Sequence, residues 1–111
     1  MLVSFLKRLT SSMMRKVLGF KQQVFGKYLG RYRELCPHVL GYTNGKAQAL
    51  FYQFGGESNS RPIETGSPYN WRCMELDLLE IDYVRDGEWH TANNHEFPQH
   101  CVHNVDIEVR F

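Results

Sequence analysis

The first segment of the chain repeats apolar residues at intervals of three or four positions. This spacing is typical of an amphipathic helix and predicts one over residues 4–18, with Gly19 as its end. Such a stripe either closes one end of the domain's own core, or lies on a membrane or a partner helix. The apolar stripe consists of Leu2, Phe5, Leu6, Leu9, Met13 and Val17.

After residue 20 the apolar residues alternate with polar ones or form short runs, as they do in β-strands. Asn44-Gly45 is the strongest hairpin signal in the chain, because both residue types tolerate a positive φ angle. Leu29-Gly30 and Asp86-Gly87 predict two further turns. The expected strands cover residues 23–28, 32–42, 47–54, 71–78, 79–85 and 104–111.

The expected fold is mainly β, with an N-terminal α-helix and five to six antiparallel strands that curl into a small β-barrel or a tightly bent sheet. Residues 47–54 are largely apolar on both faces, so this strand is expected at the centre of the sheet. Residues 55–70 are rich in Gly, Ser and Pro, which favours a mobile or functional loop. We expect two parts, a basic helix over 1–19 and a β domain over 20–111.

The charged residues divide the chain into two unlike segments. Residues 1–33 carry eight basic side chains and no acid, whereas all 12 acids lie from Glu34 onward with five bases. The basic segment either meets an anion or packs against the acidic body of its own domain. Aromatic residues interleave with its bases, a pattern that suits phosphate neutralisation and base stacking on single-stranded nucleic acid. The candidate nucleic-acid residues are Arg15, Lys16, Lys21, Lys27, Arg31 and Arg33.

Three cysteines, Cys36, Cys73 and Cys101, form no obvious disulfide framework. An odd and widely spaced set fits a reducing compartment, so the expected location is the cytoplasm. The longest apolar runs are only a few residues, which is too short to span a membrane, and no membrane partner is expected.

Candidate catalytic chemistry is sparse. The densest polar cluster holds residue types that bind zinc but no paired motif such as Cys-x-x-Cys, so histidines in a surface loop are the preferred interpretation. No Gly-x-Ser-x-Gly motif and no glycine-rich phosphate loop is present in the sequence. We therefore expect a non-enzymatic protein without a metal site or cofactor. The cluster comprises His90, His95, His100, Cys101 and His103.

Four stretches of the sequence, "CPHVLGY", "NGKAQALFYQFGGES", "WRCMELDLLEI" and "DGEWHT", together resemble the WYL-domain family of bacteria, in particular its short, free-standing members. The resemblance covers most of residues 21–90. It implies an Sm-like (SH3-type) small β-barrel and a ligand-sensing role in transcription regulation or phage defence. Family members are thought to bind nucleotides or nucleic acid through a basic groove.

The family motifs are carried over only in part. The Trp-Tyr-Leu triplet that names the family falls on residues 47–49, which here read Ala-Gln-Ala, while Tyr52 matches a later tyrosine. In the next strand, Arg72 fits the first arginine of the family frame. Glu75 and Leu78 stand where two further arginines are expected.

The resemblance implies that Arg72 holds an anion at the rim of the core. Around it we expect a ligand-binding set of Trp71, Tyr52 and Tyr69 as stacking partners, with Arg61 on the adjacent loop. The expected ligand is a nucleotide or a short single-stranded nucleic acid. The alternative is a protein-interaction module that dimerises or docks through helix 4–18 or strand 104–111.

Overall fold

The computed structural model describes residues 11–58, 62–64, 66–92 and 99–109. Within these ranges the chain forms an α-helix, a 3-10 helix and six strands. The elements are α2 (Ser11–Gly19), β1 (Gln23–Tyr28), β2 (Arg31–Thr43), β3 (Lys46–Gly56), β4 (Trp71–Glu75), the 3-10 helix η1 (Leu76–Leu78), β5 (Leu79–Arg85) and β6 (Asn104–Glu108).

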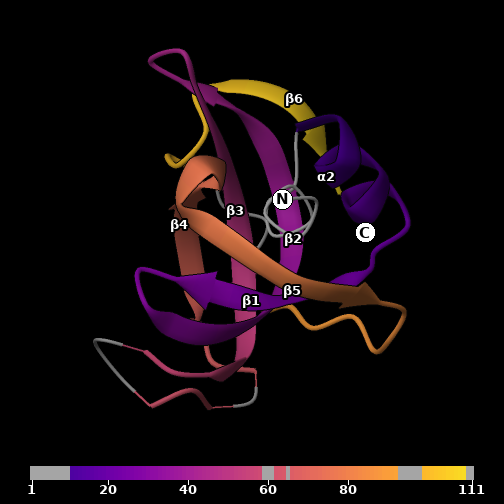
Figure 1. The fold of residues 1–111 in the computed structure, drawn as a ribbon, viewed down its shortest axis with the longest axis vertical. Coiled ribbons are helices and arrows are strands. Elements are labelled where there is room, and N and C mark those ends of the chain that lie inside the picture. Colours follow the sequence, from indigo (N-terminus) through magenta and orange to yellow (C-terminus); the bar gives the residue numbers. More distant parts are fainter. Residues whose placement is uncertain (1–10, 59–61, 65, 93–98, 110–111) are drawn as a thin grey trace, which may run out of the picture.

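All six strands belong to one antiparallel sheet with the order β4-β3-β2-β1-β5, and β6 pairs with β2 as well. The long strand β2 is therefore the hub of the sheet (Figure 1). Along one edge it pairs with β3. Along the other edge it pairs first with β1, over Arg31–Leu35, and then with β6, over Val39–Tyr42. This arrangement confirms that the strand at 47–54 lies inside the sheet.

The sheet is strongly bent but open. In Figure 1, β1 and β5 lie crosswise to β3 and β4. In the described part of the chain no strand ladder joins β4 to β5, the two ends of the sheet order. Of the two expected forms, the structure shows the bent sheet, and the closed barrel stays a prediction.

The two tight hairpins are confirmed. Leu29 and Gly30 connect β1 to β2 with φ angles of 52° and 80°, and Asn44 and Gly45 connect β2 to β3 with φ angles of 53° and 78°. Positive φ at both central residues is the turn geometry that matches the twist of a two-residue hairpin.

Two local predictions are wrong. The strand expected over 71–78 ends at Glu75, because the chain turns there into the 3-10 helix η1 before β5 begins. Asp86-Gly87 does not form a strand hairpin, since residues 86–92 carry no strand. Gly87 instead lies against the Gln23 side chain, which a Cβ at Gly87 would meet at 2.6 Å.

The main core lies between α2 and the concave face of the sheet. The helix contributes Met14, Val17 and Leu18, which are at most 6% exposed, whereas Met13 of the predicted stripe is 45% exposed. The buried face of α2 is thus shifted by one residue from the predicted stripe. The packing of the helix against β2 determines which face is buried. The stripe residues before Ser11 lie outside the described residues. No helix in the described ranges is long and apolar enough to cross a membrane.

The expectation that the three cysteines form no disulfide framework is wrong. Cys73 in β4 and Cys101 in the segment before β6 form a disulfide across 28 residues of sequence. The sheet brings these two segments together, and their separation along the chain gives no sign of it. The inference of a reducing compartment loses its premise. Cys36 remains a thiol, is fully buried in β2, and its pKa is raised to about 11 by burial.

Candidate anion-binding site

A pocket opens at one end of the main core, between the β1–β2 hairpin and β4. It has a volume of about 270 Å³. The base of the pocket is apolar, since Met74 is 1% exposed and belongs to the core cluster. The pocket also contains two arginines from strands that are not adjacent in the sheet. Its lining residues are Tyr28, Leu29, Arg33, Ser58, Arg72, Cys73 and Met74.

Arg33 lines this pocket as a buried residue of β2. In the β1–β2 ladder its neighbour on the same face of β2 is Leu35, a fully buried core residue, so strand alternation directs Arg33 inward. Arg33 is only 4% exposed, and its Nη1 donates a hydrogen bond to Oε1 of Gln53 at 3.0 Å. Its Nε has no hydrogen-bond partner among the described residues. A buried donor of this kind is costly unless a ligand or water satisfies it.

Two glycines lie opposite Arg33 on the two neighbouring strands. Gly26 of β1 and Gly56 of β3 are its register partners. Gly56 has a φ angle of +85°, and a Cβ there would lie 2.4 Å from the Tyr32 carbonyl oxygen and 3.1 Å from Cα of Arg33. Because opposite residues of an antiparallel pair share a face, Arg33 stands between two positions without side chains.

Arg72 approaches the pocket from β4. Its Nη1 donates to the carbonyl oxygens of Tyr69 at 2.7 Å and of Trp71 at 2.9 Å, and its Nη2 donates to Ser58 Oγ at 3.0 Å. These bonds hold the guanidinium group in place at the mouth of the pocket. The expectation that Arg72 lies at the rim of the core agrees with its partial exposure and with its place beside buried Met74.

The pocket is electrostatically positive. Burial lowers the pKa of Arg33, and the positive charges of Arg72 and then Arg31 lower it further, while Tyr28 and Glu57 act in the opposite direction. Burial also lowers the pKa of Arg72. Within the described ranges no carboxylate lies within 4.0 Å of either guanidinium group; the ion pairs found there join Arg15 to Asp106 and Lys46 to Glu75.

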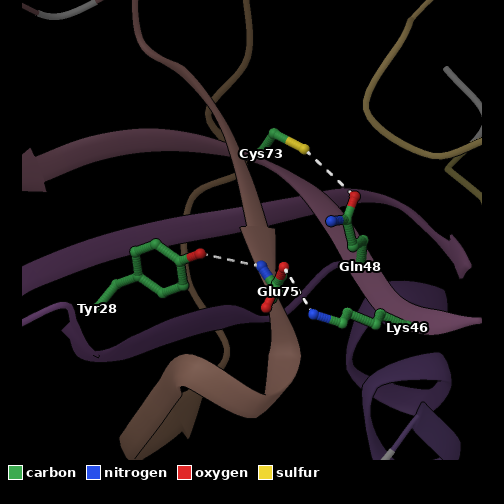
Figure 2. A network of polar contacts seen from close by, with 5 residues as sticks. All are labelled: Tyr28, Lys46, Gln48, Cys73 and Glu75. Atoms are coloured by element: carbon green, nitrogen blue, oxygen red, sulfur yellow. Dashed lines mark hydrogen bonds and ion pairs between the residues drawn. The ribbon is translucent and has the colours of Figure 1, made fainter. Parts of the chain in front are cut away.

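Glu75, which replaces an arginine of the family frame, does not neutralise the pocket. By strand alternation its side chain lies on the opposite face of β4 from Arg72 and Met74. Figure 2 shows its carboxylate facing Lys46, at 3.9 Å, while its backbone N–H donates to the Tyr28 hydroxyl at 3.1 Å. Tyr28 thereby links β1 to the outer edge of β4 beside the pocket.

The other predicted ligand residues do not gather around Arg72. Trp71 and Tyr52 pack edge to face at 5.0 Å on the opposite face of the sheet, and Trp71 also packs against His38 at 4.7 Å. Tyr52 is 1% exposed and its hydroxyl donates to the Ser67 carbonyl, so it forms part of a second small core. Tyr69 is 60% exposed and contributes its carbonyl oxygen. Arg61 lies outside the described residues.

The predicted nucleic-acid residues do not form one surface. Arg15 is paired with Asp106 of β6 at 2.5 Å, which is the internal charge balance that the sequence left open. Arg33 is buried in the pocket, and Arg31 is close enough to affect its pKa. The remaining members are exposed on the end of α2, the following turn and β1, at Lys16, Lys21 and Lys27.

The histidine cluster is dispersed. His90 stacks on Phe54 at 4.3 Å, Cys101 is held in the disulfide, and His95 lies outside the described residues. His100 and His103 are exposed. In the part of the chain that the structure describes, no three His, Cys, Asp or Glu side chains are grouped to hold a metal ion.

Sequence reasoning missed the pairing of Arg33 with Arg72 and the role of Gln53. The signal for Arg33 was present, because it is two residues before Leu35 in a strand and therefore shares its inward face. Gln53 gave no such signal. It is fully buried among apolar neighbours on β3 and serves as the anchor of Arg33.

Comparisons with models of protein families, with curated proteins and with solved structures found no match to this chain. The resemblance to the WYL-domain family therefore stays a prediction.

Proposed function

We propose that the chain is a non-enzymatic, WYL-like module that binds a phosphate-bearing anion, a nucleotide or a short single-stranded nucleic acid, in the pocket between Arg33 and Arg72. The observation that carries this proposal is the pair of guanidinium groups lining one pocket of about 270 Å³, with no carboxylate within 4.0 Å among the described residues. The open, bent sheet is compatible with the small SH3-type barrel of the proposed family.

The physical reason is the cost of burying an unpaired cation. Moving a charged side chain out of water is unfavourable unless an opposite charge or several hydrogen bonds compensate it. Arg33 is 4% exposed, is bonded by a neutral amide, and keeps one donor without a described partner. A phosphate group would offset both charges, and arginine is well suited to phosphate because of its planar set of donors.

The rim of the pocket suits the rest of a nucleotide. Tyr28 and Leu29 line the pocket from the β1–β2 hairpin, and Leu29 is 64% exposed. An aromatic ring and an exposed apolar side chain beside a phosphate site provide surface for a base or a sugar. The Tyr28 ring is fixed by the hydrogen bond between its hydroxyl and the N–H of Glu75.

A binding titration tests the proposal. A fluorescently labelled oligothymidylate and labelled adenosine 5′-monophosphate are titrated with the protein, and fluorescence anisotropy is measured at several salt concentrations. We expect saturable binding that weakens steeply with salt, because phosphate binding displaces counterions. Arg33→Gln and Arg72→Gln each weaken binding by about tenfold or more. Lys46→Gln removes a cation outside the pocket and serves as the control.

Absence of salt-sensitive binding to both probes would refute the proposal. So would an unchanged affinity in both arginine variants, provided that their circular dichroism spectra match that of the wild type. The second outcome would assign the anion to another surface.

A protein-interaction role is the second candidate, favoured by the surface of β6. Val105 is 48% exposed there, and a hollow of about 470 Å³ is lined by residues Val105 to Val109. An apolar partner or a second copy of the chain would bind this surface, and its association would persist or strengthen with salt. Sedimentation at low and high salt distinguishes this behaviour from phosphate binding.

A further inference from the structure

The hydrogen-bond donors of the pocket favour one class of phosphate group over another. This inference rests on the proposed anion binding. Among the described residues, Arg72 donates through Nη1 and Nη2 to three oxygen atoms of the protein, whereas Arg33 has one hydrogen bond, through Nη1, and its Cζ lies 5.9 Å from the centre of the Tyr28 ring. Both guanidinium groups remain charged at neutral pH, because arginine does not lose its proton in proteins. The described part of the pocket thus carries two positive charges and no carboxylate within 4.0 Å of either guanidinium group; Glu57 lies farther off and offsets the charge of Arg33 only in part.

We infer that the pocket takes the terminal phosphomonoester of a nucleotide or of a nucleic-acid strand, in preference to an internal phosphodiester. A phosphomonoester carries nearly two negative charges at pH 7 and three terminal oxygens. It therefore neutralises both arginines and offers one acceptor to each. A phosphodiester carries one negative charge, so one of the two guanidinium groups stays uncompensated in a partly desolvated site.

The shape of the pocket favours the same ligand. Its base is closed by the core, with Met74 1% exposed and Arg33 4% exposed. Its volume of about 270 Å³ lies near the lower limit of small-molecule sites, which is roughly 300 Å³. A terminal phosphate enters such a site with one covalent connection leading out. An internal phosphate has two connections to its strand, and both must leave through the mouth of the pocket.

The edge of β4 adds a third donor at this point. The backbone N–H of Glu75 faces away from β3, since it donates to Tyr28. Hydrogen-bonding groups alternate in direction along an antiparallel strand, so the N–H of Cys73 faces the same way. Cys73 also lines the pocket. Backbone N–H groups bind phosphate oxygens without a positive charge of their own, and this one supplies a hydrogen-bond donor for the third terminal oxygen.

A matched pair of oligonucleotides tests the inference. Two single strands of ten thymidines differ only in a 5′-phosphate or a 5′-hydroxyl group, and their affinities are compared by competition against a labelled probe at fixed salt. We expect the phosphorylated strand to compete about tenfold better at pH 7.5. The difference shrinks as the pH falls to 5, because the second phosphate ionisation has a pKa near 6. Adenosine 5′-monophosphate and cyclic 3′,5′-adenosine monophosphate repeat the comparison without a strand.

The outcomes separate the inference from the proposed function. If both strands compete equally, the site reads internal phosphates, and the inference fails while anion binding stands. If neither strand binds, anion binding itself fails. Arg33→Gln and Arg72→Gln should each abolish the preference for the 5′-phosphate, whereas Lys46→Gln should keep it. A preference that survives both arginine changes would place the terminal phosphate elsewhere. Should a variant unfold, the wild-type comparison still decides.

Discussion

Gln53 holds Arg33 in place from inside the sheet. Its Oε1 accepts a hydrogen bond from Nη1 of Arg33 at 3.0 Å, and its Nε2 donates to the carbonyl oxygens of Gly55 at 2.9 Å and Glu57 at 2.7 Å. The amide is completely buried. One neutral side chain thus connects the buried cation of the pocket to the end of β3.

Replacement of Gln53 by Leu should destabilise the protein and weaken phosphate binding together. It removes three hydrogen bonds and leaves buried polar groups unsatisfied, which costs about 2–4 kcal/mol in the free energy of unfolding. Urea denaturation measures the stability, and anisotropy measures the binding. Gln48→Leu on the same strand is the control, since Gln48 is less buried and should change stability by less than about 1 kcal/mol. Equal effects of the two changes would contradict the anchoring role.

Replacement of Gly56 by Ala should destabilise the fold and displace Arg33. The φ angle of +85° strains an alanine, and its Cβ would lie 2.4 Å from a backbone oxygen. Strain alone costs about 1 kcal/mol, and the clash adds to it. Gly66→Ala isolates the strain, because Gly66 has a φ angle of +73° and nothing within 4 Å of the added Cβ. Thermal denaturation should show the larger loss at Gly56; similar losses would mean that the neighbouring backbone yields without cost.

Loss of the disulfide should lower stability by about 3–4 kcal/mol in the chain-entropy description, because it closes 28 residues of sequence. The measurement compares urea unfolding of the oxidised protein with that of the Cys73→Ser, Cys101→Ser double variant. Thiol labelling gives an independent check. The unfolded, oxidised protein should label at Cys36 alone, and the reduced, unfolded protein at three cysteines. Three labelled cysteines without reductant would contradict the pairing.

Alkaline pH should weaken the protein through Cys36. Burial raises the pKa of its thiol from 9.0 in the unfolded chain to about 11 in the folded one. The folded state therefore holds the proton more tightly, and its contribution to stability is complete below pH 9 and is lost as the pH rises to 11. The loss amounts to about 3 kcal/mol. Unfolding free energies are measured by urea titration between pH 8 and 11. Cys36→Ala should show a shallower decline, and an identical decline would assign the effect to other groups.

Most of the strand pattern was predictable from the sequence because it depends on local chemistry. The hairpin at Asn44 and Gly45 forms since both residues accept a positive φ angle, and the predicted strand over 23–28 has the bounds of β1. The end of β4 was not predictable by periodicity. Leu76 and Leu78 continue an apolar pattern that fits a strand, but the chain must turn at this point for β5 to reach β1 on the far side of the sheet.

Only one of the two arginines of the candidate site was predictable from the sequence. Arg72 was found by its place in a motif, whereas the partner that makes it a site, Arg33, lies 39 residues earlier on a strand that is not its neighbour in the sheet. Contacts between non-adjacent strands depend on how sharply the sheet bends. The same limit explains Trp71 and Tyr52. They are close to Arg72 in sequence or register, but alternation sends them to the opposite face.

Arg72 has a consequence for solubility as well as for binding. β4 is a short edge strand whose outward carbonyl groups would otherwise accept hydrogen bonds from a strand of another molecule. The guanidinium group occupies the carbonyl oxygens of Trp71 and Tyr69 and places a charge beside this edge. A charge at such a place is one of the devices that discourage pairing of an edge strand with another molecule. An uncharged residue at this position would remove from this edge both the charge and the hydrogen bond to the Trp71 carbonyl.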